Sequence, residues 1–327
     1  MNRKENALRI LNFDHPERVT SDLPAHRVSY LGCHHEAYDS TGERSPVGTR
    51  WTDIWGIGWE KKQEGIMGYP VFHPLAEPES FKSYRWPDPD DERICGRIYS
   101  GAKTGREPDT FLLGAHRNLL FEKVNKLMGM ENLMVYFHTE PGFVREVFRG
   151  YMDFQLRIAR HYLECGVEAV ELSEDLGAQT ATLLSPQIVD EFLVPEYQRL
   201  FLVYNERGVI IKLHSCGHVE PLLDTFIRLG VRMLNPLQVT ANNLDMVRSR
   251  TQGKMALQGG IRSTTVRNGP VEKIRAEVRE RLWQLGREGG YFCNADQGLD
   301  FPKAHAEALQ KAIEDYGRYP IQDPRYG

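Results

Sequence analysis

Short apolar runs alternate with longer amphipathic segments through most of the chain. The runs are rich in β-branched and aromatic residues. Because the strands of a buried parallel sheet read as nearly continuous apolar runs, each run predicts a strand. The eight predicted strands span residues 28–32, 110–115, 133–138, 168–173, 209–214, 233–236, 255–259 and 291–294.

The segments between these runs carry helix start and stop signals. Pro186 and Pro270 stand at first turns, and Gly208 and Gly230 follow helix ends, where a left-handed residue is wanted. Strands that alternate with helices predict βαβ units, and eight units predict an α/β fold of the (β/α)8 TIM-barrel type. An open doubly wound sheet is the alternative, but no Gly-x-Gly-x-x-Gly or Walker loop follows a strand. The predicted helices span residues 3–12, 117–129, 141–165, 186–207, 219–229, 241–251, 270–288 and 303–316.

Residues 35–108 interrupt this alternation. The stretch has weak helical periodicity and holds four of the tryptophans, Trp51, Trp55, Trp59 and Trp86. Aromatic side chains under a long loop usually form a local core. We therefore expect an irregular insertion, with short strands at most, that elaborates one end of a single domain spanning residues 1–327.

Charge and composition exclude several classes of function. The net charge is −4, and no cluster of Lys and Arg forms a stripe, which argues against a nucleic-acid partner. No uncharged apolar run approaches the roughly 18 residues that span a bilayer, and the charged first segment is no signal peptide. We expect a cytoplasmic protein. The five cysteines are odd in number and sparse, so a disulfide framework is not expected.

Polar side chains collect just after the predicted strands. In a barrel the carboxyl ends of the strands meet at one mouth, where catalytic residues lie. Glu174 and Asp175 are candidate catalytic carboxylates, as a general base or as a ligand that substrate displaces; a helix cap or a salt-bridged loop is the alternative for each. The candidate substrate-binding residues at the same ends are Asn235, Gln238, Gln258 and Asp296.

His214 and Cys216 form the sharpest pair in the chain. Side chains two positions apart on a strand point the same way, so an imidazole and a thiol would share one face. Cys293 in the last predicted strand could supply a second thiolate. Two thiolates and an imidazole suit a zinc ion that keeps an open coordination position. The alternative is that Cys293 is a small buried hydrophobe.

Several motifs together resemble the uroporphyrinogen decarboxylase superfamily. The match runs from about residue 3 to residue 316 and is strongest over 166–262. The resemblance implies a (β/α)8 barrel. Its motifs are Lys212-Leu213-His214-Ser215-Cys216-Gly217-His218-Val219, Leu234-Asn235-Pro236-Leu237-Gln238, Ala256-Leu257-Gln258-Gly259-Gly260-Ile261, Leu172-Ser173-Glu174-Asp175-Leu176-Gly177 and Trp86-Pro87-Asp88-Pro89.

The superfamily resemblance points toward one of two branches. True decarboxylases carry an Arg-Gln-Ala-Gly-Arg motif, and residues 23–32 lack it. The cobalamin-dependent methyltransferases are similar in another way, because their zinc signature is His-x-Cys followed much later by Cys. Carried over to this sequence, that signature implies His214, Cys216 and Cys293 as zinc ligands.

The leading hypothesis is therefore a zinc-dependent methyltransferase. It would move a methyl group between methylcobalamin, or another corrinoid, and a small molecule such as a thiol acceptor or a methyl donor; the direction stays open. No Asp-x-His-x-x-Gly motif is present, so a partner corrinoid protein would carry the cofactor. The chain could also pair as a homodimer.

Two other hypotheses remain. One is a metal-free lyase that decarboxylates another carboxylated substrate, with Glu174, Asp175 or Asp296 as the acid or base. In that enzyme Arg27, Arg117 or Arg262 would clamp carboxylates. The other is a non-catalytic protein that binds zinc or a corrinoid through a closed site.

Overall fold

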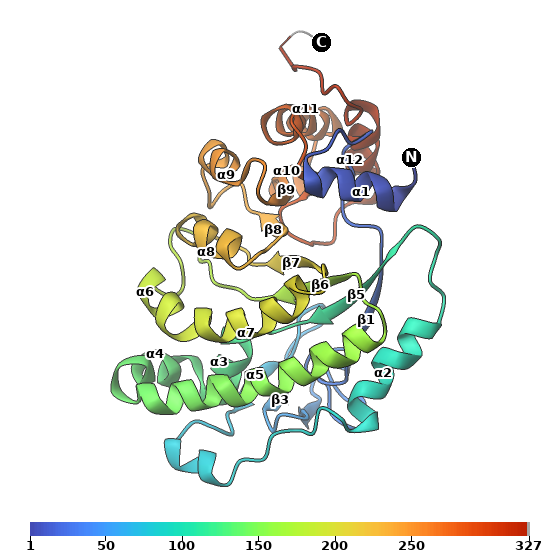
Figure 1. Ribbon diagram of the computed structural model, residues 1–327. Helices are drawn as coiled ribbons and strands as arrows, with labels where there is room; N and C mark the ends of the chain where they lie inside the picture. The colour runs from blue at the N-terminus through green and yellow to red at the C-terminus, as the bar shows by residue number, and fades with distance from the viewer. Residues whose placement is uncertain (326–327) are drawn as a thin grey trace.

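A curled, seven-stranded parallel sheet forms the centre of the molecule (Figure 1). The computed structural model describes residues 1–325. The strand order is β1-β5-β6-β7-β8-β9-β10, so each strand after β1 lies beside the one before it in this sheet. The strands are β1 (Ala25–Ser29), β5 (Phe111–His116), β6 (Ala169–Ser173), β7 (Ile210–His214), β8 (Met233–Leu237), β9 (Ala256–Ile261) and β10 (Tyr291–Ala295).

Helices cover the convex face of this sheet and leave the concave face inside, as the ribbon shows (Figure 1). The crossover helices follow the predicted positions closely. The helices are α1 (Arg3–Asn12), α2 (Glu92–Lys103), α3 (Phe121–Met128), α4 (Met130–Thr139), α5 (Pro141–Glu164), α6 (Pro186–Ile188), α7 (Val194–Asn205), α8 (Leu223–Arg228), α9 (Leu244–Thr251), α10 (Ser263–Asn268), α11 (Val271–Arg281) and α12 (Lys303–Tyr316).

The predicted strand at residues 133–138 is wrong. These residues lie within the helix α4, where Leu133 and Phe137 are buried while Val135 is exposed. Burial every four residues is the signature of a helix packed on one side. Seven of the eight predicted strands therefore exist, with boundaries shifted by a few residues, and the closed eight-stranded barrel is not what the described residues form.

The predicted insertion is more regular than expected. It holds a three-stranded antiparallel sheet, ordered β2 (Arg50–Thr52), β3 (Gly58–Glu60) and β4 (Tyr69–Phe72). The helix α2 also falls within it and packs against β1. Trp55 and Trp59 are almost fully buried, so the expected local aromatic core is confirmed.

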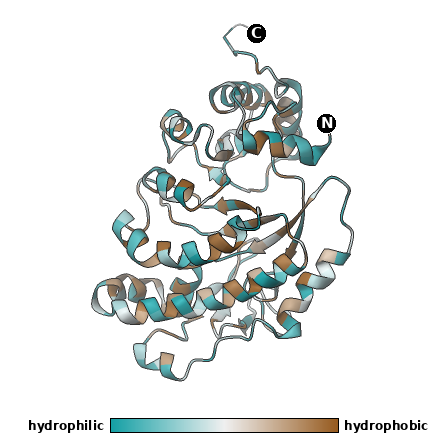
Figure 2. Ribbon diagram, in the orientation of Figure 1, coloured by the Kyte–Doolittle hydropathy of each residue, from teal (hydrophilic) through white to brown (hydrophobic). Residues whose placement is uncertain are grey.

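A separate apolar cluster lies on each face of the main sheet. The convex face joins the large core under the helices, and the ribbon coloured by hydropathy shows the strands as mostly hydrophobic (Figure 2). The concave face has a smaller cluster near the amino ends of the strands, closed by α1. The smaller cluster consists of Ala7, Ile10, Leu11, Leu23, Phe111, Leu113, Ala169, Ile210, Met233, Ala256 and Phe292.

Polar residues replace this apolar cluster toward the carboxyl ends of the same strands. Two positions beyond Ala169 and Ile210 lie Glu171 and Lys212, which are paired in register, and the next inward position on β7 is His214. The alternation of a strand thus places a charged layer and then a polar mouth above an apolar floor.

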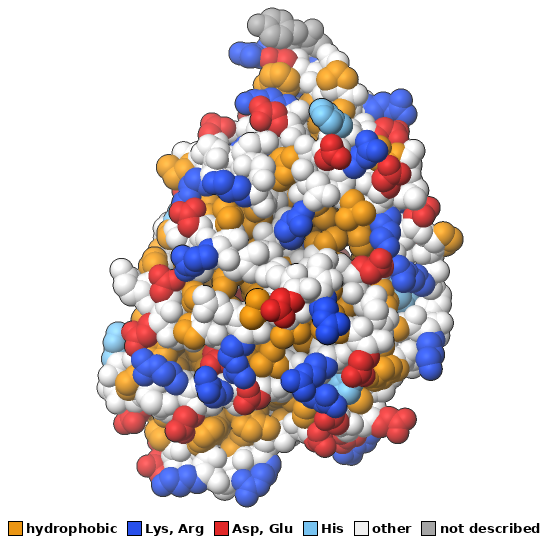
Figure 3. Space-filling view, viewed as in Figure 1, with side chains coloured by type: hydrophobic (Ala, Val, Ile, Leu, Met, Phe, Trp, Pro, Cys, Tyr) orange, Lys and Arg blue, Asp and Glu red, His pale blue; other side chains and the backbone are white. Residues whose placement is uncertain are grey.

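The outer surface shows no charge segregation on the face that is drawn. Basic and acidic side chains are interspersed there (Figure 3). Many pair across neighbouring helices, for example Arg145 with Glu191 and Arg250 with Asp224. Within residues 1–325, no helix is both long and apolar enough to cross a lipid bilayer.

Candidate functional site

Asp175 and His214 form a pair at the carboxyl ends of β6 and β7. His214 Nε2 lies 3.5 Å from Asp175 Oδ1, and the two side chains keep 32% and 40% of their surface exposed. Burial alone would lower the pKa of His214, but the hydrogen bond and charge of Asp175 outweigh it and raise that pKa. Burial also opposes ionisation of Asp175, yet His214 holds the pKa of this carboxyl at about 2. The pair is a reachable carboxylate–imidazole dyad.

Cys216 lies beside this dyad, as predicted. Its backbone N–H donates to Asp175 Oδ1 at 3.3 Å, and burial followed by the Asp175 charge raises the pKa of its thiol to about 12. Gln238 fixes the next residue, because its Oε1 accepts the Gly217 N–H at 3.0 Å. The His-Ser-Cys-Gly turn is thereby tied to both the β6 and β8 ends.

Asn235 on β8 contacts His214, and Gln258 on β9 contacts Asn235. His214 Nδ1 lies 2.8 Å from Asn235 Oδ1, and Asn235 Nδ2 lies 2.7 Å from Gln258 Oε1. The structure therefore brings Asp175, His214, Cys216, Asn235 and Gln258 together at one mouth.

Glu174 faces away from this mouth. Its carboxylate is fully buried and accepts N–H groups of Leu120 (2.6 Å), Phe121 (2.9 Å) and Glu122 (2.8 Å) at the start of α3. Tyr197 Oη donates to it at 2.7 Å. Burial raises the pKa of Glu174 to about 7. A carboxylate at a helix N-terminus accepts backbone N–H groups that have no partner within the helix, so Glu174 anchors the start of α3. Of the predicted pair, only Asp175 therefore reaches the site.

Asp296 is likewise a structural tie. Its carboxylate is buried and accepts the N–H of Ser263 at 2.9 Å, the hydroxyl of Ser263 at 2.6 Å and the N–H of Val239 at 3.2 Å. These bonds join the loops that follow three strands. Its oxygens are committed to the protein, so the predicted contact with substrate is not supported by its surroundings.

The predicted zinc trio is not assembled. Cys293 belongs to the outer core with Tyr291, whereas Phe292 joins the inner floor. Its pKa is raised to about 12 by burial, and the charges that act on it come from Glu277 and Arg281 of α11, on the convex face. His214 lies on the concave face, so the two side chains point to opposite sides of the sheet.

The residues present do not fit the zinc centre expected from the sequence. Across residues 1–325, no group of three His, Cys, Asp or Glu side chains is arranged to hold a metal ion. His214 and Cys216 remain two neighbouring donors without the third that the resemblance implied. No catalytic step is therefore assigned to zinc here.

Cys293 should not contribute to metal binding, because it faces the outer core. We therefore expect Cys293→Ala and the wild type to contain equal amounts of zinc per chain. Inductively coupled plasma mass spectrometry on the purified proteins measures it. His214→Gln is the matched comparison from the mouth. If the wild type contained one zinc ion per chain and Cys293→Ala contained none, the cysteine would reach the site.

Sequence reasoning missed a charged network just below the mouth. Arg27 donates to both oxygens of Glu171, at 3.0 and 2.5 Å, and Lys212 Nζ lies 3.4 Å from Glu171 and 2.8 Å from Asp22. Glu171 and Lys212 are charged residues inside otherwise apolar strands. That anomaly was the available signal, because a charge within a buried strand needs a partner on its own face.

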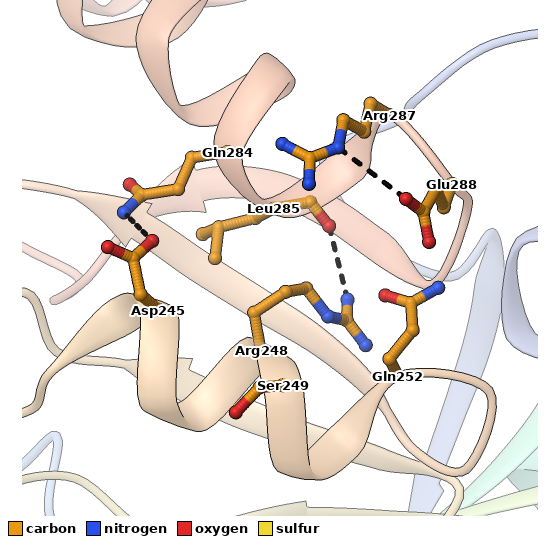
Figure 4. A pocket seen from close by; sticks show the side chains of 8 residues that line it. All are labelled: Asp245, Arg248, Ser249, Gln252, Gln284, Leu285, Arg287 and Glu288. Atoms are coloured by element: carbon orange, nitrogen blue, oxygen red, sulfur yellow. Dashed lines mark hydrogen bonds and ion pairs between the residues drawn. The ribbon is translucent and has the colours of Figure 1, made fainter.

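One cavity lies between α9 and the segment after α11 and shares no lining residue with this mouth (Figure 4). It measures about 260 Å³. Arg248 lines it, but its guanidinium donates to the backbone carbonyls of Leu285 (3.1 Å) and Gly290 (3.0 Å). The arginine thus ties α9 to the segment between α11 and β10, and the dyad remains the better candidate site.

A comparison with models of protein families shows to which family the chain belongs. The model of the uroporphyrinogen decarboxylase (URO-D) family matches residues 63–316. The chain belongs to the uroporphyrinogen decarboxylase family. A search of curated proteins found no match for this family member.

Solved structures confirm the fold. A methyltransferase from Methanosarcina mazei superposes with a TM-score of 0.71 at 16% sequence identity, covering 97% of this URO-D family member and 99% of the other chain. A B12-independent methionine synthase from Shewanella sp. W3-18-1 gives a TM-score of 0.43 at 12% identity, over 63% and 60% of the two chains. Only the first superposition is close enough to support a shared overall fold.

Proposed function

We propose that this URO-D family protein is a methyltransferase. It would move a methyl group between a corrinoid carried by a partner protein and a small molecule that binds at the mouth. The observation that carries the proposal is the Asp175–His214 dyad, because it offers a proton acceptor and donor at the end of the sheet where catalysis is expected.

The residues of this chain would handle the proton that accompanies methyl transfer. If the substrate is a thiol or hydroxyl acceptor, His214 Nε2 takes its proton as the methyl group arrives. If the substrate is a methyl ether or thioether, protonated His214 returns the proton to the departing oxygen or sulfur. In both directions Asp175 stabilises the imidazolium by charge.

The corrinoid would supply a cobalt centre that accepts or donates the methyl group. The partner would approach the exposed parts of Asp175 and His214, which are the reachable members of the site. Cys216 and Gln238 hold the surrounding turn in place through the backbone contacts described above.

Three observations favour methyl transfer over decarboxylation. Arg27 donates to both carboxylate oxygens of Glu171, and Arg262 Nη1 lies 3.2 Å from Glu277 Oε1. Two of the three candidate carboxylate clamps therefore already have carboxylate partners. Glu174 and Asp296, two of the three candidate acids, are tied to backbone groups. The superposition over nearly the full length of a protein named as a methyltransferase supports the same choice.

The test is an assay in both directions. Purified protein is incubated with methylcob(III)alamin and a panel of thiols, and separately with reduced cobalamin and methyl ethers or thioethers. Loss or gain of the methylcobalamin absorbance, with mass spectrometry of the methylated small molecule, reports transfer. Carbon dioxide release from a carboxylated substrate, without methyl transfer in either direction, would establish the lyase instead.

A further inference from the structure

A line of hydrogen-bonded amides crosses three strands behind His214. It begins at the backbone carbonyl of Ser21, which accepts from Gln258 Nε2 at 2.8 Å. It continues through Gln258 and Asn235 to the imidazole, with donor–acceptor distances of 2.7 and 2.8 Å. Gln258 is only 2% exposed, so its side-chain amide is largely shielded from water.

The backbone carbonyl fixes the direction of every bond in this line. A carbonyl oxygen can only accept, so Gln258 must present its NH₂ group to Ser21 and its oxygen to Asn235. Asn235 must then present its NH₂ group to Gln258 and its oxygen to His214. An amide oxygen only accepts, so His214 Nδ1 must carry a proton.

We propose that Gln258 and Asn235 are positioning residues that keep a proton on Nδ1 of His214, so that Nε2, which faces Asp175 and the mouth, is the nitrogen that gains and loses a proton. The inference rests on the proposed function, because it specifies how the proton-handling nitrogen is kept available. It also replaces substrate binding as the role of both amides, since their polar groups are already used within the protein.

A second contact makes Asn235 the stronger of the two supports. Its backbone carbonyl accepts the Ser215 N–H at 2.7 Å, so one residue of β8 grips both the side chain of His214 and the chain just after it. The hydroxyl of Ser215 in turn accepts the Leu176 N–H at 3.0 Å and links this turn to the loop that carries Asp175. The orientation of the dyad is thus set by the strands β6, β8 and β9 together.

Nuclear magnetic resonance of the full chain labelled with ¹⁵N-histidine tests the inference directly. The chain has 11 histidines, and the His214 signals are assigned by their loss in His214→Gln. In the wild type at a pH where His214 is neutral, we expect a protonated Nδ1 and an unprotonated Nε2. A protonated Nε2 with a bare Nδ1 would overturn the proposal.

Variants separate positioning from simple structural support. Asn235→Leu and Gln258→Leu should give mixed tautomers and lower kcat at least about tenfold, since the wrong tautomer of a catalytic histidine is costly. Asn235→Asp should restore the Nδ1–H form, because its carboxylate can accept the same proton. Gln238→Leu, an amide at the same mouth outside the line, should leave the tautomer as in the wild type.

The outcomes also distinguish this inference from the proposed function. Variants that melt like the wild type and keep a pure Nδ1–H tautomer would overturn the role of the amides. A wild-type protein with the expected tautomer and no methyl transfer in either direction would overturn the proposed function and leave the hydrogen-bond assignment intact.

Discussion

Replacing His214 with glutamine should lower kcat/KM for methyl transfer by roughly a hundredfold or more. Glutamine can keep a hydrogen bond to Asn235, but it cannot gain or lose a proton in the neutral pH range. The Asp175 carboxylate, 3.5 Å away, would lose the cation that it stabilises. Steady-state kinetics with the substrate found by the two-direction assay measures the effect.

Cys293→Ala is the matched control for His214→Gln. Both residues were predicted as ligands of one metal ion, but only His214 lies at the mouth. We expect this cysteine variant to keep kcat/KM close to the wild-type value and to lose only a little stability. Equal losses in the two variants would contradict the placement of Cys293 and revive a shared site.

Removing Glu174 should destabilise the protein more than any substitution at the mouth. Glu174→Ala leaves three N–H groups at the start of α3, two of them buried, and the buried hydroxyl of Tyr197 without their acceptor. Each buried donor that loses its partner costs about 1–3 kcal/mol, and the effects overlap, so we expect a total loss of about 3–5 kcal/mol in the free energy of unfolding. Urea denaturation followed by circular dichroism measures it.

Glu191→Ala is the comparison at the surface. Its carboxylate is 56% exposed and pairs with Arg145, and exposed pairs of this kind contribute at most about 1 kcal/mol. Tyr197→Phe removes one of the four bonds to Glu174 and should fall between the two. Similar stability of Glu174→Ala and Glu191→Ala would show that the buried carboxylate is not an anchor.

The sequence located the strands well where they are β-branched and bounded by glycine. The run before His214 is such a case, and β7 ends at the predicted residue. The sequence-based prediction failed at residues 133–138, where an apolar run fits a strand and one face of a helix equally well. Contacts from α4 to α3 and α5, the helices just before and after it in the chain, settle that ambiguity.

The resemblance to the URO-D family also came from sequence alone and is confirmed. Apart from residues 86–89, the motifs that carry it lie at or near the carboxyl ends of β6 to β9. In the structure His214 contacts Asn235, and Cys216 contacts Asp175 of the dyad. Their roles in catalysis remain a proposal.

What only the tertiary structure decided is the side of the sheet on which each side chain lies. Tyr291, Phe292 and Cys293 are all buried, so no polar alternation in the sequence shows which of them faces inward. Glu174 and Asp175 are adjacent carboxylates in the sequence. In the structure Glu174 accepts the free N–H groups at the start of α3, whereas Asp175 pairs with His214 at the mouth. Local patterns determine that a strand forms and where it ends, whereas the face that a residue presents depends on the packing of the whole sheet.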